Sequence, residues 1–307
     1  MSNFDVISIG AATLDIFMKS DKFKVVKSSD IPGGIAMCEV YGGKMEVEEV
    51  AIVSGGGATN TAVSFARKDL ATAIIAEMGN DPQSLLIHRD LEEAQVETRF
   101  LVQEQGETTA VSVVLIAEDG GRSIMVHRGA SAMLTKSDLP LDELETRWMH
   151  ISSLGGNMEL LATLLKWAKS KRVRISLNPG MKEIGKKDKL LPLLSMVEIL
   201  FLNRSEAQAL WREEEQKLGA YVSVITDGAK GGELREGGKT SFYEGEKVKK
   251  VVDTTGAGDA FASGVVAGVL YGKTYEQAIV WGQKNAVAIL KHVGAKKGLL
   301  TLAEINR

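Results

Sequence analysis

The sequence predicts an α/β protein, in which helices cover both faces of a mostly parallel sheet and a second, small β-sheet lies beside it. Two observations support this fold class. Short apolar runs alternate with helical segments through most of the chain, as in the βα units of a parallel sheet. Two other segments, 16–54 and 98–128, nearly alternate apolar and polar residues, which is typical of half-exposed antiparallel strands.

The core elements follow one another in chain order. After a first strand at 4–10, we expect helix 59–68, strand 71–76, helix 82–94, strand 150–154, a helix capped by Asn157, strands 174–177, 198–202 and 221–226, and helix 275–292. The segments 1–15, 55–97 and 129–307 would then form the core, and 16–54 with 98–128 the small sheet. Ligands of such folds bind beyond the carboxyl ends of the strands, where glycine and polar clusters gather here.

Composition narrows the function classes. The 307 residues are 44% hydrophobic and 25% charged, as in a soluble globular protein, and the net charge of −3 without a basic stripe argues against nucleic acid as a partner. A single cysteine, Cys38, excludes an internal disulfide framework and a cysteine-based zinc cage. The start of the chain lacks a basic segment before its apolar run, and no apolar run approaches ~18 residues. These features predict a cytoplasmic protein that does not enter a membrane.

The most informative motif is DTTGAGD at 253–259, which follows a strand-like run at 247–252 and opens an apolar, helical stretch. Two glycines at such a turn let the backbone pass close to a ligand, and the free N–H groups of the first helical turn then point at it. The helix dipole makes this place a receptor for phosphate. Asp259 is there either an ordinary helix cap or a general base that takes a proton from a substrate hydroxyl during phosphoryl transfer.

Residues 253–266 resemble the second signature of the ribokinase-like (PfkB) sugar and nucleoside kinases, and residues 55–62 with Gly79 resemble the first. One position departs from the family pattern, because Asp69 stands where Gly or Ser is usual. Asp tolerates the left-handed conformation that this helix end needs, so the departure weighs little. The resemblance extends from Gly10 to Ala295. It implies the ribokinase-like fold, with the small sheet as a lid.

The resemblance also implies an acceptor site. Asp259 would be the base, and the amides of Gly256, Ala257, Gly258 and Asp259 would stabilise charge on the transferring phosphoryl group. A sugar would be held by Asp259 and by residues near the first signature, namely Thr13, Asp15, Gly56, Gly57 and Asn60. Carboxylate and amide groups suit sugar hydroxyls, although a solvated loop Asp and a glycine hinge are the structural alternatives.

For the donor, the resemblance implies ATP with Mg2+, and a monovalent cation near Asp253. Asn203 and Glu206 match an Asn-x-x-Glu motif in which Glu206 would hold Mg2+, although the same four residues are also a common helix-capping pattern. Thr226, Gly228 and Gly231 would line the nucleotide, or simply form a tight turn, and Asn285 would lie beside the adenine.

The sequence does not match the P-loop motif or the dinucleotide-binding motif. Residues 268–274 have three residues between their glycines where a P-loop needs four, and no Gly-x-Gly-x-x-Gly follows the first strand. The four histidines lack the spacing of metal ligands.

The acceptor stays open at this stage. Ribose is doubtful because residues 151–156 carry no carboxylate where ribose-phosphorylating relatives have one. The sequence favours a carbohydrate kinase, with a nucleoside kinase of the same family as the alternative and a non-catalytic sugar- or nucleotide-binding regulator as a third possibility. The exposed face of the small sheet could also form a homodimer.

Overall fold

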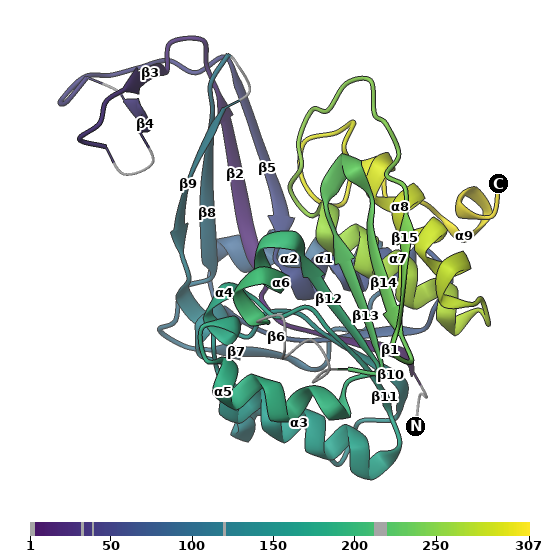
Figure 1. The fold of residues 1–307 in the computed structure, drawn as a ribbon. Helices are drawn as coiled ribbons and strands as arrows, with labels where there is room; N and C mark the ends of the chain where they lie inside the picture. Colours follow the sequence, from purple (N-terminus) through teal and green to yellow (C-terminus); the bar gives the residue numbers. More distant parts are fainter. Residues whose placement is uncertain (1–3, 32–33, 39, 119–120, 212–219) are drawn as a thin grey trace.

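The computed structural model describes residues 4–31, 34–38, 40–118, 121–211 and 220–307. Within them, nine strands form one large sheet in the order β15-β14-β13-β12-β11-β10-β1-β6-β7 (Figure 1). Neighbouring strands run parallel from β13 through β7, whereas β14 and β15 add an antiparallel pair at one edge. The predicted α/β architecture, with a mostly parallel sheet and a smaller sheet beside it, is confirmed.

The strands of this sheet are β1 (Phe4–Ile9), β6 (Thr72–Gly79), β7 (Leu101–Glu104), β10 (Thr146–Ile151), β11 (Arg174–Leu177), β12 (Ile199–Asn203), β13 (Val222–Thr226), β14 (Gly232–Glu236) and β15 (Lys239–Tyr243). The α-helices are α1 (Gly57–Ala66), α2 (Pro82–Glu93), α3 (Met158–Lys171), α4 (Met181–Ile184), α5 (Lys187–Leu190), α6 (Arg204–Leu210), α7 (Ala257–Leu270), α8 (Tyr275–Ile289) and α9 (Leu302–Ile305). Short 3-10 helices lie at Gly129–Ala132 (η1), Lys136–Asp138 (η2), Leu191–Met196 (η3) and Gly228–Lys230 (η5).

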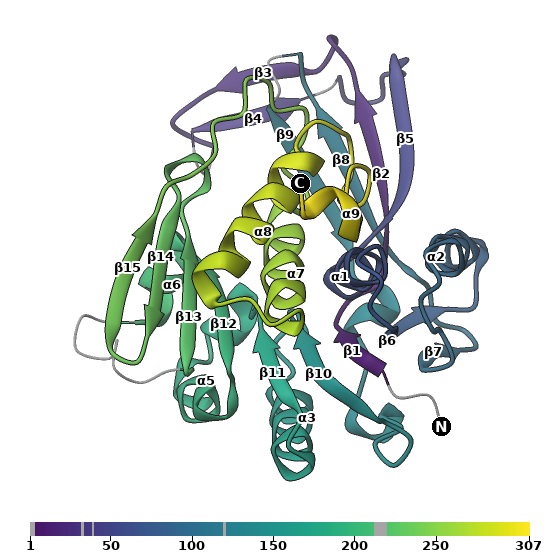
Figure 2. The ribbon, with the colours of Figure 1, turned by 90° about the vertical axis from the view of Figure 1, so that its right-hand side faces the viewer.

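Both faces of the large sheet are buried, because alternate residues of a strand point to opposite sides. On β12, Leu200 and Leu202 pack in the core cluster that α3 and α6 cover, whereas Ile199 and Phe201 pack in the cluster of α7 and α8. Figure 2 shows α1, α7 and α8 next to one another above β10 and β11, and α3 below these strands, on the other side of the sheet. This double cover explains the continuous apolar runs in the sequence.

A four-stranded sheet in the order β5-β2-β8-β9 stands apart from the core (Figure 1). Its strands are β2 (Thr13–Lys19), β5 (Glu49–Gly55), β8 (Ala110–Ile116) and β9 (Arg122–His127), and β3 (Lys24–Lys27) pairs separately with β4 (Ile35–Cys38). Phe17 and Val114 lie side by side on the face that is buried. The opposite face carries the apolar row of Ile52, Ile16, Val113 and Met125, of which Ile52 and Met125 are exposed.

The structure differs from the sequence prediction in three segments. Within 16–54, β3 and β4 pair only with each other and do not join the four-stranded sheet. Segment 98–128 was expected to join the small sheet throughout, but β7 pairs in parallel with β6 of the core. Leu101 and Val102 pack against core clusters, so this short strand is stabilised by burial at the edge of the large sheet. The strand-like run at 247–252 is not a strand, because Val251 and Val252 are left about half exposed with no strand partner among the described residues.

Candidate active site

The turn that precedes α7 has the geometry expected of an anion site. Gly256 caps the helix in the left-handed conformation, with φ 74°, and a Cβ there would lie 2.2 Å from the Cβ of Ala295. Only glycine fits such a position. Ala257 is the first helical residue, so the N–H groups of Gly258 and Asp259 fall in the first turn, where no intrahelical acceptor exists. The helix therefore presents the free N–H groups of Gly258 and Asp259 and its positive dipole end, whereas the N–H of Ala257 donates to Thr254 O at 3.2 Å.

Asp259 lies in the first turn of α7 and faces α1. Its Oδ2 accepts a hydrogen bond of 2.8 Å from Nδ2 of Asn60, a residue 199 positions earlier in the chain. Burial raises the pKa of the Asp259 carboxyl, the Asn60 hydrogen bond opposes this, and the negative charge of Asp15 adds to the rise. A carboxylate whose pKa is raised toward neutrality, and which is held in place by an amide, has the properties of a general base.

Two cavities meet at this turn. Ala257 and Gly258 line one of about 420 Å³, and Asp259 lines another of about 250 Å³. The helix N-terminus therefore borders both cavities, the larger through Ala257 and Gly258 and the smaller through Asp259.

The smaller cavity is mostly polar. Ser152, Ser153 and Asn178 line it together with Gly57 and Asp259. The Ser152 hydroxyl is buried and has no hydrogen-bond partner within the described structure, so it is available to a ligand. Gly57 lets α1 approach this wall, since a Cβ on it would lie 2.6 Å from Ser152. Such an array of hydroxyl and amide groups suits a polyhydroxyl ligand.

Glu183, which the sequence analysis missed, holds two walls of the smaller cavity together. Its buried carboxylate accepts hydrogen bonds from the backbone N–H groups of Leu154, Gly156 and Gly180 and from the Ser153 hydroxyl. The spacing of Gly180 and Glu183 is that of a capping box, and the sequence could have shown this. It could not have shown the contacts to residues 153–156.

The other predicted acceptor residues lie around the smaller cavity rather than in its lining. Asp15 is buried on β2 and accepts a hydrogen bond from Thr13 Oγ1 at 3.2 Å, and burial raises its pKa. Gly55 is packed so closely that a Cβ would lie 2.0 Å from Asp15 Oδ2. Gly56 has φ 93° and touches the carbonyl of Ala11, so the turn into α1 requires glycine.

The larger cavity contains three of the predicted donor residues, Thr226, Gly228 and Gly231. The rest of its lining is largely apolar and includes Val248, Phe261 and Val287. A mostly apolar cavity that borders an anion site is suited to a nucleotide.

Asn285 does not lie where the sequence analysis expected. It is fully buried, donates to Ala260 O and Ser64 Oγ, and accepts from Lys68 Nζ and Leu300 N. Successive residues of a helix point in different directions, so other residues of α8 reach the larger cavity instead. These are Gln283, Ala286, Val287 and Leu290, the last just past the helix end.

Asn203 and Glu206 form the capping box that their spacing indicated. Asn203 Oδ1 accepts from the N–H of Glu206 at 2.9 Å, and Glu206 Oε2 accepts from the N–H of Asn203 at 2.8 Å. Glu206 also lines the smaller cavity together with Asp259. Burial raises the pKa of Glu206, and the contacts with Asn203 oppose this. Its oxygens are of the hard type that Mg2+ prefers, so capping and metal binding are compatible here.

Asp253 joins the anion-site turn to the small sheet. Arg122, on β9, donates to Asp253 Oδ1 at 3.0 Å and to the hydroxyls of Thr254 and Thr255. The other oxygen of Asp253 accepts from the N–H of Gly294 at 3.0 Å. The carboxylate near which a monovalent cation was expected is therefore bound by a guanidinium of the small sheet.

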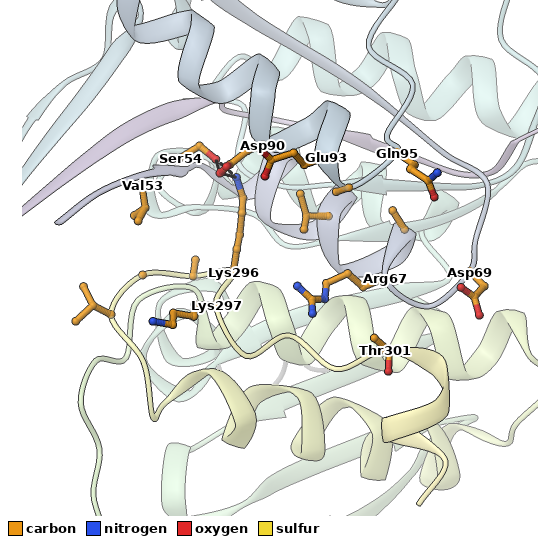
Figure 3. Close-up of a pocket in the computed structure, with 16 residues that line it drawn as sticks. Val53, Ser54, Arg67, Asp69, Asp90, Glu93, Gln95, Lys296, Lys297 and Thr301 are labelled. Carbon is orange, nitrogen blue, oxygen red and sulfur yellow. Dashed lines mark hydrogen bonds and ion pairs between the residues drawn. The ribbon is translucent and has the colours of Figure 1, made fainter.

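A third cavity, of about 610 Å³, lies between α1, α2 and the segment after α8 (Figure 3). Lys296 points from this segment toward Ser54 and Asp90, and burial lowers the pKa of its ammonium group to about 8. Side chains of both charges line it, and none of the predicted site residues does. This cavity is separate from the anion-site turn.

No cluster of three or more metal-ligating side chains and no helix able to span a membrane occurs in the described ranges.

Comparisons with known proteins agree with this geometry. Residues 4–302 match the model of the pfkB family of carbohydrate kinases, so the chain belongs to this family of ATP-dependent sugar kinases. A cytidine kinase of Thermococcus kodakarensis is 29% identical over 302 residues, which cover 94% of this chain and 97% of that protein. A ribokinase of Haemophilus influenzae is 28% identical over 82% of this chain and 86% of its own. The solved adenosine kinase of Sinorhizobium meliloti superposes with a TM-score of 0.81 at 21% identity and covers both chains completely.

Proposed function

We propose that this protein transfers the γ-phosphoryl group of ATP to a hydroxyl of a sugar or sugar derivative bound in the smaller cavity. One observation carries the proposal: the N-terminus of α7 borders two cavities, one lined by Asp259 and the other by Ala257 and Gly258. Phosphoryl transfer needs such an arrangement, with the donor and acceptor on opposite sides of an anion site.

Asp259 takes the proton of the acceptor hydroxyl as its oxygen attacks the γ-phosphorus. The bond from phosphorus to the bridging oxygen of ADP then breaks, and ADP leaves with the electron pair. The amides of residues 256–259 stabilise charge on the phosphoryl oxygens during the transfer. Asn60 orients the base through its hydrogen bond to Asp259 Oδ2. Thr226, Gly228 and Gly231 contact the nucleotide from the far wall.

Glu206 would hold Mg2+, directly or through water, and Asn203 would fix this carboxylate through the capping box. When bound, the metal neutralises part of the charge on the phosphate tail. The fit rests on a carboxylate that lines the same cavity as Asp259.

The small sheet would act as a lid over the acceptor and exclude water, since hydrolysis of ATP competes with transfer. Arg122 supports this role because it already links β9 to the anion-site turn. Amides of 13–19, 49–55 and 110–127 should then exchange more slowly when acceptor and nucleotide are both bound. Protection restricted to the larger cavity would contradict the lid.

A homodimer through the exposed face of the small sheet is part of this proposal. Ile52, Ile16, Val113 and Met125 form a continuous apolar row there, and a second copy would cover it. Ile52→Lys should produce a monomer in light scattering if this face forms the contact, and an unchanged mass would exclude it.

A monovalent cation near Asp253 would have to share the carboxylate with Arg122, so stimulation by KCl should be larger in Arg122→Gln than in the unmodified protein.

A nucleoside kinase is the second candidate, and the similarity to the cytidine kinase favours it. An ADP-release screen with ATP and Mg2+ decides between the two when pentoses, hexoses, sugar acids, sugar phosphates and nucleosides are offered side by side. Acceptor-dependent ADP release supports transfer, and the preferred acceptor identifies the class. Equilibrium binding of sugar and nucleotide without product across the whole panel would overturn the kinase in favour of a regulator.

A further inference from the structure

The smaller cavity is lined by an exposed arginine that has no part in the proposed transfer reaction. Arg128 lines this cavity, together with Ser131 and Ala132 from the same turn. Among the described residues that line it, Arg128 is the only one with a cationic side chain, whereas Glu206 and Asp259 contribute two carboxylates. An arginine is charged at every physiological pH.

Within the described residues, the guanidinium of Arg128 makes no hydrogen bond or ion pair. Other arginines near the site are paired, Arg122 with Asp253 and Arg204 with Glu233. For Arg128, the described structure contains only a contact of its backbone carbonyl, which accepts a hydrogen bond of 2.6 Å from Ser131 Oγ. Its five N–H donors are therefore available to a ligand.

The backbone of Arg128 is held in a fixed position. It directly follows β9 and is the N-cap of η1, where Ala130 is completely buried and donates its N–H to Thr108 O at 2.9 Å. Gly129 has φ 44° and packs so closely that a Cβ would lie 2.1 Å from that same carbonyl. Arg128 therefore projects from a turn whose position is set by packing on both sides.

We propose that the acceptor is a compact sugar derivative that carries an oxyanion, a phosphate or a carboxylate, and that Arg128 binds this group. This inference rests on the proposed transfer reaction and names its substrate class. A planar guanidinium matches both oxyanions with two parallel hydrogen bonds. A neutral sugar would leave Arg128 unpaired, and the two carboxylates would repel an anion without it.

The size of the cavity agrees with this class. Its volume of about 250 Å³ lies below the usual range of ligand sites, which favours a single sugar ring or chain with one charged group. The unpaired Ser152 hydroxyl offers the acceptor a further hydrogen bond.

Matched acceptor pairs test the proposal: ribose with ribose 5-phosphate, fructose with fructose 6-phosphate, and glucose with gluconate and 2-keto-3-deoxygluconate. An acidic member should exceed its neutral partner in kcat/KM by about 30- to 300-fold, the effect of one or two charge-assisted hydrogen bonds. The phosphate and carboxylate arms identify which oxyanion is used. A neutral sugar or a nucleoside as the best acceptor would overturn the proposal while leaving the kinase intact.

Arg128→Gln should lower kcat/KM for the acidic acceptor by about 30-fold or more, change the neutral one less than about 3-fold, and leave the KM for ATP unchanged. Arg128→Lys should restore part of the loss. Arg89→Gln on α2, an exposed arginine paired with Glu93, is the matched control and should behave like the unmodified protein. A raised KM for ATP would instead assign Arg128 to the donor, and equal losses on both acceptors would also contradict the proposal.

Calorimetric binding without ATP separates this inference from the reaction. The acidic sugars should bind the unmodified protein and bind Arg128→Gln at least about 10-fold more weakly. If they do so while no acceptor yields ADP, the oxyanion site stands and the transfer reaction fails. If ADP forms and binding is equal in both proteins, the reaction stands and the oxyanion site fails.

Discussion

The two cavities that meet at the N-terminus of α7 are built differently. The larger one is lined by glycines and apolar side chains, such as Gly228, Gly231 and Val287, whereas the smaller one is lined by serines, an asparagine and charged residues. Backbone and apolar contacts suit a donor that every member of a kinase family shares. Polar side chains discriminate between acceptors, because an unpaired buried polar group is costly. The two cavities therefore offer different kinds of contact to the two ligands that we propose.

The largest expected effect comes from the residue at the boundary between the cavities. Asp259→Asn should reduce kcat by roughly 10²- to 10⁴-fold and leave ATP binding nearly unchanged, because the loss of a general base acts on the transition state. Steady-state kinetics with a binding titration of ATP measure both. Activity within a few-fold of the unmodified protein would reduce Asp259 to a helix cap.

The raised pKa of Asp259 predicts how the rate and the stability depend on pH. Because burial raises the pKa of Asp259, the folded state disfavours its ionised form, and this cost exists at every pH above the unfolded value. The rate should therefore fall as the pH drops through the raised pKa, and Asp259→Asn should be at least as stable as the unmodified protein at neutral pH. A large loss of stability would mean that the carboxylate serves the fold.

The features that the sequence predicted are those set by local patterns, and the features it missed depend on long-range contacts. The strands and the glycine turns were predictable because burial of both sheet faces and positive φ angles impose local patterns, as at Gly256. Glu183, Arg122 and Arg128 were missed because they act through contacts that sequence spacing does not encode. Arg122 and Asp253, for example, are 131 positions apart. Asn285 was misplaced because its family motif gives no helix direction, and the direction was set by packing of α8 on α1 and α7.

A substitution of Glu206 tests whether the smaller cavity also binds Mg2+. Glu206→Gln should raise the Mg2+ concentration for half-maximal rate by about 10-fold, the scale expected when a metal contact is lost. Gln at this position keeps the capping box with Asn203, so the fold should not change. An unchanged Mg2+ titration would leave Glu206 with the capping role alone.

Two variants with shortened side chains test whether the two cavities bind their ligands independently. Ser152→Ala removes a hydroxyl from the smaller cavity, and Val287→Ala removes two methyl groups from the larger one. Each should raise one Michaelis constant by about 3- to 10-fold, the acceptor's for Ser152 and that of ATP for Val287, and leave the other unchanged. If either variant changes both constants, the cavities are coupled and the division is wrong.

We expect the smallest kinetic effect from a substitution of Lys68, a residue that lines neither cavity. This lysine is completely buried, and its Nζ donates to Ser64 O and Oγ at 3.0 Å and to Asn285 Oδ1 at 3.3 Å, with no carboxylate among its contacts. Burial, with the nearby charge of Arg67, lowers its pKa from 10.5 to about 7. Ser64 in turn accepts from Ser263, which also donates to the backbone carbonyl of Asp259 at 2.7 Å. Lys68 is thus linked to the backbone of Asp259 through three hydrogen bonds and lines neither cavity.

Between pH 7 and 10.5 the unfolded chain keeps the Lys68 proton that the folded protein has lost, so the unfolded state binds more protons and stability rises with pH. Lys68→Met removes this dependence. From pH 7.5 to 9.5 the unmodified protein should gain about 2 kcal/mol of unfolding free energy relative to Lys68→Met, as measured by urea denaturation. The kcat of the variant should stay within about 2-fold, because neither ligand contacts this cluster. Parallel stability curves would mean that Lys68 keeps its proton in the fold, and a large fall in kcat would show that the cluster positions Asp259 through Ser64 and Ser263.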